Sequence, residues 1–143
     1  MALPNIFDKN VTQGLIARIN QLKADSQPKW GKMTAPQMLA HCNVTYEMVY
    51  TEKFILKLFV KNIVVSEKPY KRNSQTAPAF LITDTRDFEI ERKRLIDYLN
   101  QTQALGAKSF DNKDSNSFGK LSIEEWNNMF YKHLDHHLTQ FGV

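Results

Sequence analysis

Apolar residues recur at steps of three and four along several segments of this chain, which is the spacing of one buried face on an α-helix. The first such segment covers residues 9–23 and carries Val11, Leu15, Ile19 and Leu22 in this pattern. The spacing therefore predicts a helix over 9–23 that packs one side against a core.

A second helix is predicted over residues 34–51. Thr34-Ala-Pro-Gln37 places a threonine at the N-cap, a proline in the first turn and a glutamine at the third helical position, which is a capping box. A stripe that includes Met38 and Tyr46 follows at helical spacing. We expect this stripe to face the core.

Two further helices are predicted in the second half of the chain. One covers 86–105, with acidic residues in its first turn and Gly106 after its last turn. The other covers 122–140 and starts with a second capping box, from Ser122 to Glu125. Both segments carry apolar residues at helical spacing.

The remaining segments give weaker signals. Residues 52–65 fit either a helix or a β-branched strand, and we favour a helix. Residues 66–85 contain proline, asparagine and serine and predict an irregular segment, and loops of this length in a compact domain are often functional. Residues 107–120 predict a polar loop. The fold expected is all-α: a single domain over 1–143, built as a four-helix bundle.

Composition supports this class and bounds the function. Hydrophobic residues make up 42% of the 143 residues, and only 5 glycines and 5 prolines argue against a turn-rich β-sandwich. The net charge of +4 arises partly from a basic stretch between Lys53 and Arg72. We interpret that stretch as a solvated face, since a nucleic-acid binder also needs a reading element and none is evident.

The cysteine content and the hydropathy predict a cytoplasmic protein. The single Cys42 excludes an internal disulfide, which suits a reducing compartment. The most apolar run, 54–65, is interrupted by Lys57 and Lys61 and is too short to span a bilayer. The first residues do not resemble a signal peptide.

The four histidines carry the candidate chemistry. His133 and His137 stand four residues apart on one helical face, and a wheel of about 100° per residue places both inside the apolar arc of the last helix, with His136 at its edge. His41 lies beside the buried stripe of the second helix. Three imidazoles could hold one metal ion and leave a position for water or substrate. The alternative is that hydrogen bonds satisfy these histidines.

Other residues near the histidines favour plainer roles. Thr45 and Gln37 lie one turn either side of the histidine of the second helix and could support it, although ordinary interhelical hydrogen bonds are favoured for each. We interpret Cys42 as a core residue, and Trp30 and Trp126 as packing residues.

Several segments resemble the DinB/YfiT-like superfamily, and in particular a branch of short bacterial proteins of unknown function. They are WGKMTAPQMLAHC over 30–42, FGKLSIEEW over 118–126 and HLDHHLTQFG over 133–142, with a further likeness over 72–89. The resemblance covers nearly the whole chain. In this family a His-Pro often precedes the Phe-Gly before the last helix. This chain departs from that pattern, because the stretch 115–118 reads Ser-Asn-Ser-Phe.

The resemblance implies an up-down-down-up four-helix bundle and a divalent metal ion, commonly nickel or zinc. The positions that carry over as ligands are His41, His133 and His137, whereas His136 matches an extra histidine that is not counted as a ligand. Some relatives are transferases or isomerases that use low-molecular-weight thiols such as mycothiol or bacillithiol.

The sequence therefore leaves two hypotheses for the function. The first is a metal-dependent thiol S-transferase or hydrolase that acts on a small molecule. No general base is evident, and Tyr46 and Glu47 are candidates only by their nearness in sequence. The second is a non-catalytic small-molecule-binding or stress-related module without bound metal. The sequence leaves the oligomeric state open, a homodimer included.

Overall fold

The computed structural model describes residues 1–51, 61–74 and 78–143, and these residues are mainly helical. The four long helices are α1 (Lys9–Asn20), α2 (Ala35–Tyr50), α4 (Phe88–Leu105) and α5 (Ile123–Gln140). The short helices are α3 (Lys61–Val64) and two 3-10 turns, η1 (Pro78–Phe80) and η2 (Ala107–Phe110). The strands β1 (Lys113–Asp114) and β2 (Lys120–Leu121) pair antiparallel, with Lys113 opposite Leu121. The prediction of a mainly helical chain is confirmed.

Side chains that accept hydrogen bonds from free backbone amides define where the long helices begin. Thr34 and Ser122 each form the predicted capping box, and both reciprocal bonds are present in each. Asp8 and Asp87 cap the other two long helices. Each cap satisfies an amide that has no partner within the helix.

The boundaries differ from expectation in a few places. α1 ends at Asn20 rather than at residue 23, and the expected loop over 107–120 contains η2 and the small hairpin. The helix favoured over 52–65 is seen only as α3, because 52–60 lie outside the described residues.

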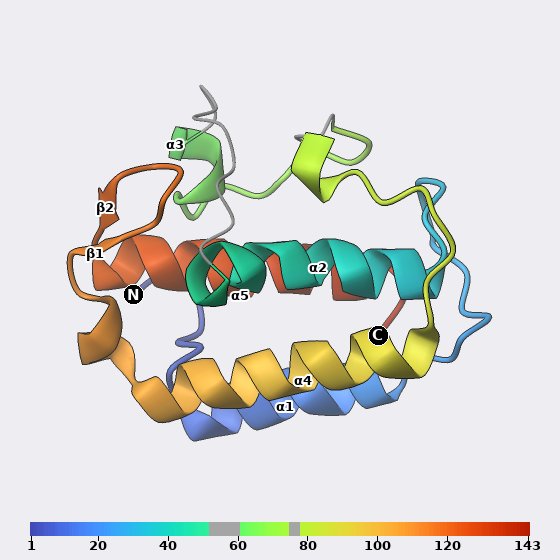
Figure 1. The fold of residues 1–143 in the computed structure, drawn as a ribbon, viewed down its shortest axis with the longest axis horizontal. Coiled ribbons are helices and arrows are strands. Elements are labelled where there is room, and N and C mark those ends of the chain that lie inside the picture. The colour runs from blue at the N-terminus through green and yellow to red at the C-terminus, as the bar shows by residue number, and fades with distance from the viewer. Residues whose placement is uncertain (52–60, 75–77) are drawn as a thin grey trace.

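The four long helices pack in a closed ring in the order α1, α4, α2, α5 and back to α1. Figure 1 shows that α1 and α5 run in one direction and that α2 and α4 run in the other. The neighbours α2 and α4 are parallel, so their connection must return along the length of the helices. Its described part, 61–74 and 78–87, passes over one side of the molecule in Figure 1.

Aromatic stacking forms the centre of the core. Tyr46 of α2 lies between Tyr98 of α4 and Phe130 of α5, with ring centroids 5.6 and 4.9 Å away and nearly parallel planes. Trp126 and Phe110 extend this cluster. Burial of each such ring contributes on the order of 2–3 kcal/mol to folding, so the two helices that carry the histidines are fixed by packing.

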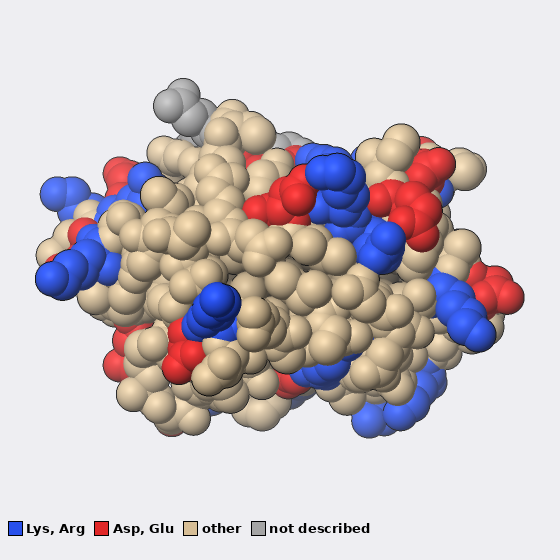
Figure 2. Space-filling view, turned by 90° about the horizontal axis from the view of Figure 1, so that it is seen from below, with Lys and Arg blue, Asp and Glu red and all other residues tan. Residues whose placement is uncertain are grey.

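Charges on the surface over α1 and α4 are of mixed sign. Figure 2 shows Lys and Arg interspersed with Asp and Glu on this face, and on α4 they form pairs such as Arg92 with Glu89 and Lys93 with Asp97. Within the described residues, no helix combines the length and apolar character needed to cross a bilayer.

Candidate metal centre

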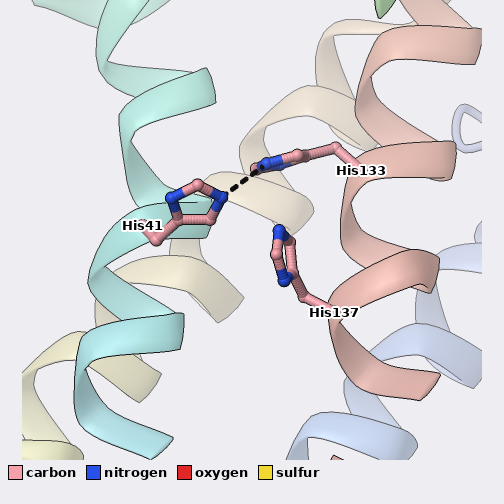
Figure 3. A group of neighbouring side chains, drawn as sticks. All are labelled: His41, His133 and His137. Carbon is pink, nitrogen blue, oxygen red and sulfur yellow. Dashed lines mark hydrogen bonds between the residues drawn. The ribbon is translucent and has the colours of Figure 1, made fainter. Parts of the chain in front are cut away.

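Three histidines from two helices converge between α2 and α5. His41 lies on α2, and His133 and His137 lie on successive turns of α5. One nitrogen of each ring lies within 4.8 Å of the corresponding nitrogens of the other two. Figure 3 shows the three rings turned toward a common point. The prediction that these residues meet is confirmed.

The outer nitrogens of two of these rings are held by oxygen acceptors. His41 donates from Nδ1 to the carbonyl oxygen of Phe80 at 2.7 Å, and His137 donates from Nδ1 to Oε1 of Gln140, also at 2.7 Å. Because neither acceptor carries a proton, these bonds assign the proton of each neutral ring to Nδ1. The lone pair of each of these rings is therefore on Nε2.

The third ring has a different hydrogen-bond pattern. Nε2 of His133 lies 2.9 Å from Nε2 of His41, and since the latter carries no proton, His133 is the donor. Nδ1 of His133 then accepts from the hydroxyl of Thr45, 3.1 Å away. For Nε2 of His133 to bind an ion, its proton must move to Nδ1, and the Thr45 hydroxyl can then accept instead of donate.

The donor set fits a divalent transition metal. Ligand nitrogens bind zinc at about 2.0–2.1 Å, which puts two of them roughly 3.3 Å apart in a tetrahedral site. The spacing here runs from 2.9 Å for the bonded pair to at most 4.8 Å within the group, so shifts of about an ångström complete the geometry. Three imidazoles suit zinc or nickel and leave coordination positions open.

Burial keeps these imidazoles neutral. Removal from water lowers the pKa of His41, and it lowers the pKa of His133 well below the usual value, with His41 and His137 adding to the effect. For His137, burial lowers the pKa to about 3. The neutral ring is the form that binds metal, so protonation of these rings does not compete with a metal ion in the physiological pH range.

A cavity of about 700 Å³ opens onto the three histidines. Its walls come from α2 and α5, from residues 30–33 before α2, and from parts of the connection, namely 62–64, 68–71 and 80–82. This volume is typical of a site for a small molecule. All three imidazoles are among the residues that line the cavity.

Lys132 holds the connection in place over α5. Its buried ammonium donates to the carbonyl oxygens of Ile63, Ser66 and Lys68 at 2.5, 2.6 and 2.9 Å, and it lies 4.4 Å from the ring centroid of Tyr70. The three donors of the ammonium therefore match three backbone acceptors. Desolvation lowers the pKa of Lys132 to about 8.

Gln140 links the site to the segment before α2. Its Oε1 accepts from His137, and its Nε2 donates to the carbonyl oxygen of Trp30 at 2.8 Å. Gly31 makes this close approach possible, because its φ is +81° and a Cβ there would lie 2.8 Å from Nε2 of Gln140.

His136 takes part in the cavity but not in the ligand group. Its ring lies 5.0 Å from that of His137 and 5.6 Å from that of Trp30, and it lines the cavity. It is not a member of the group whose nitrogens converge. This placement agrees with the interpretation of His136 as an extra histidine.

The two candidates for a general base lie away from the cavity. Tyr46 is buried in the aromatic stack, where desolvation raises the pKa of its hydroxyl well above the usual value. Glu47 pairs with Arg94 of α4 at 2.7 Å. Neither residue is among those that line the cavity.

The other predicted roles are met in part. Cys42 and Trp126 are buried core residues, as expected. Gln37 serves the capping box and donates to the Asp84 carbonyl, whereas Thr45 contacts His133 rather than the histidine of its own helix. Trp30, interpreted from sequence as a packing residue, lines the cavity.

Comparison with known proteins gives no relative: no protein-family model, no curated protein and no solved structure matches this chain. A function for the chain must therefore be argued from its fold and from the geometry of the site.

Proposed function

We propose that this chain is a divalent-metal enzyme of the DinB-like kind, a four-helix bundle in which His41, His133 and His137 hold nickel or zinc. The proposed activity is transfer to the sulfur of a low-molecular-weight thiol or hydrolysis of a small molecule. The observation that carries the proposal is the convergence of three neutral imidazoles on the wall of a cavity.

The arrangement of the helices supports the family proposal. The order up, down, down, up around the ring is the order that the sequence resemblance implies. It also explains why one ligand comes from α2 and two come from α5, since these two helices are neighbours.

The chemistry divides between the ion and the protein. When bound, a divalent ion supplies positive charge that lowers the pKa of a thiol or a water molecule, so that a nucleophile forms near neutral pH. Phe80 and Gln140 fix the orientation of His41 and His137, and Thr45 adapts to either tautomer of His133. The cavity positions the small molecule beside the three rings.

A second candidate function is a small-molecule-binding module that works without metal. The direct bond between Nε2 of His133 and Nε2 of His41 favours it, because this bond satisfies both rings with no ion present. The same cavity would then bind a ligand without catalysing a reaction.

Metal content tests the two functions against each other. The protein is produced without a histidine tag, incubated with zinc or nickel, freed of excess metal and submitted to elemental analysis. We expect about one metal ion per chain, with apparent affinity typical of a three-histidine site. A chain that retains no metal after this treatment would support the second function and refute the first.

Alanine variants locate the ion. Replacement of His41, His133 or His137 by alanine should each abolish stoichiometric metal binding. His136→Ala is the matched control, because this histidine lies on the same helix and beside the same cavity but outside the ligand group. It should retain the metal. Circular dichroism of each variant checks that the helices are intact.

A further inference from the structure

Among the described residues, the charged side chains that line the cavity are of one sign. Lys32, Lys68 and Lys71 line it, and no aspartate or glutamate among the described residues does so. All three lysines are exposed, which places them toward the mouth. The face over α1 and α4 is different, because both signs are interspersed there (Figure 2). A hollow with charges of one sign concentrates counter-ions.

The histidines do not offset this charge. An imidazole is either neutral or positively charged, so it cannot cancel the positive charge of the lysines. A divalent ion on three neutral ligands would add further positive charge. The cavity is therefore suited to an anion whether or not a metal is bound.

The deeper wall of the cavity is apolar. Met48 and Met129 are buried there, with Phe80 and Phe118 partly buried beside them. Methionine side chains adapt to ligands of different shape. Apolar surface also reaches the solvent, because Ile63 and Leu81 line the same cavity and are 53% and 62% exposed. Two of the few large apolar side chains that the described surface exposes thus belong to this site.

We infer that the cavity binds small amphipathic anions, that is, carboxylates with an apolar chain or ring. The apolar part lies against Met48 and Met129, and the carboxylate lies toward Lys68 and Lys71. The volume of about 700 Å³ is that of a site for such a molecule. This inference concerns the cavity used in the proposed function, but it does not depend on the metal.

Three probes with the same chain and different head groups test the inference: octanoate, 1-octanol and octylammonium. Isothermal titration calorimetry is carried out on protein kept free of metal by a chelator, so that no carboxylate can bind an ion. Octanoate should bind at least about tenfold more tightly than octylammonium, and added salt should reduce the difference. Equal or tighter binding of octylammonium would overturn the inference.

Two double variants that remove the same charge test whether the preference for octanoate comes from the cavity lysines or from the net charge of +4 of the whole chain. The double variant Lys68→Gln, Lys71→Gln should lose most of the preference for octanoate. It leaves the backbone carbonyl of Lys68 free to accept from Lys132. The control, Lys9→Gln with Lys113→Gln, removes the same charge from exposed positions outside the cavity and should keep the preference. Equal losses in both would refute a local site.

The methionine methyl groups report where octanoate binds. Of the five methionines, Met33, Met48 and Met129 line the cavity, whereas Met1 and Met38 do not. Octanoate should shift the methyl NMR signals of the first three and leave the other two unchanged. Shifts confined to Met1 or Met38 would contradict the assignment.

Metal content measured on the same preparations keeps the two proposals apart. A preference for octanoate in a chain that binds no metal would uphold this inference and refute the metal enzyme. A chain that binds metal but has no preference for the carboxylate would refute this inference and leave the metal enzyme standing.

Discussion

Thr45 occupies a position where a hydroxyl serves two states of the site. Without an ion, it donates to Nδ1 of His133, because the proton of that ring is on Nε2, which donates a hydrogen bond to His41. With an ion on Nε2, the proton of the ring is on Nδ1, and the hydroxyl accepts a hydrogen bond from it. Only a group that both donates and accepts can serve the two tautomers. A small hydroxyl residue at this position is therefore part of the site.

Removal of this hydroxyl should weaken metal binding. Thr45→Val keeps the shape of the side chain but offers no acceptor to the Nδ1 proton of His133. We expect zinc affinity to fall by about 10- to 100-fold, the usual effect of losing a partner of a metal-bound histidine. Competition with a chromogenic chelator measures it. Thr45→Ser is the control and should bind zinc nearly as the unchanged protein does; equal losses in both variants would refute the role.

The ligands were predictable from sequence, whereas most of their partners were not. His133 and His137 lie at helical spacing on an apolar face, and this is a signal that sequence carries. The partner of His41 is a backbone carbonyl, that of Phe80, and no side-chain pattern reports it. Gln140 is three residues after His137 on one helix, so the spacing of helical neighbours could have identified it.

At the level of elements, α5 carries two of the three proposed ligands and also the residues that hold the connection from α2 to α4. Asn128 donates to the Val65 carbonyl at 3.0 Å, and Lys132, one turn further, donates to three more carbonyls. Residues 65–74, the described stretch that follows α3, form no helix or strand that could satisfy these groups. Side chains of α5 therefore take the place of regular backbone pairing.

Replacement of Lys132 should loosen this segment. Lys132→Met keeps the stem but removes the ammonium that donates to three backbone carbonyl oxygens, so we expect the free energy of unfolding to fall by about 1–3 kcal/mol. Urea denaturation measures this loss, and amide hydrogen exchange should speed up over residues 63–70 more than in α1 or α4.

Lys93→Met is the control for this variant. Lys93 is an exposed lysine on α4 whose ion pair with Asp97 lies at the surface, and such pairs contribute little to stability. The stability should change by no more than about 0.5 kcal/mol. A Lys132→Met protein as stable as this control would show that the carbonyl contacts are dispensable.

Helix starts were predictable because local chemistry sets them, and the hairpin was not. The capping boxes at Thr34 and Ser122 depend on residues three apart in sequence. The hairpin has strands of only two residues, and positive φ is adopted by Asn112, just before β1, and by Asn116, between the strands. A periodicity of two cannot be recognised over so short a length, so this stretch resembled a plain polar loop.

For the whole molecule, the order of the helices explains where the site lies. Because α2 and α4 are parallel neighbours, the chain must cross back along the bundle between them, and the described part of this crossing covers the histidines on one side. The same crossing supplies the carbonyl that orients His41. Topology thus provides both the walls of the cavity and part of the support of the ligands.

Burial of three neutral imidazoles also couples the stability of the whole fold to pH. The pKa of each is lowered in the folded state, to about 3 for His137, whereas an unfolded histidine titrates near 6.5. Below that value the unfolded chain takes up protons that the folded chain refuses, so the free energy of unfolding falls as pH decreases. For the same reason, protons should displace the metal only at a pH below about 6.5, the value at which an unperturbed histidine titrates.

Denaturant unfolding of the metal-free protein tests this coupling. Between pH 7.5 and 5.5, each imidazole that stays neutral in the fold should cost about 1.4 kcal/mol of stability. His137→Gln removes one such group, so its stability should fall less over this range, by about 1.4 kcal/mol. The comparison between the two proteins cancels the contribution of carboxylates, which both share. An identical pH dependence in both would mean that His137 takes up a proton as readily in the folded state as in the unfolded chain, and it would contradict the neutral state proposed for this ring.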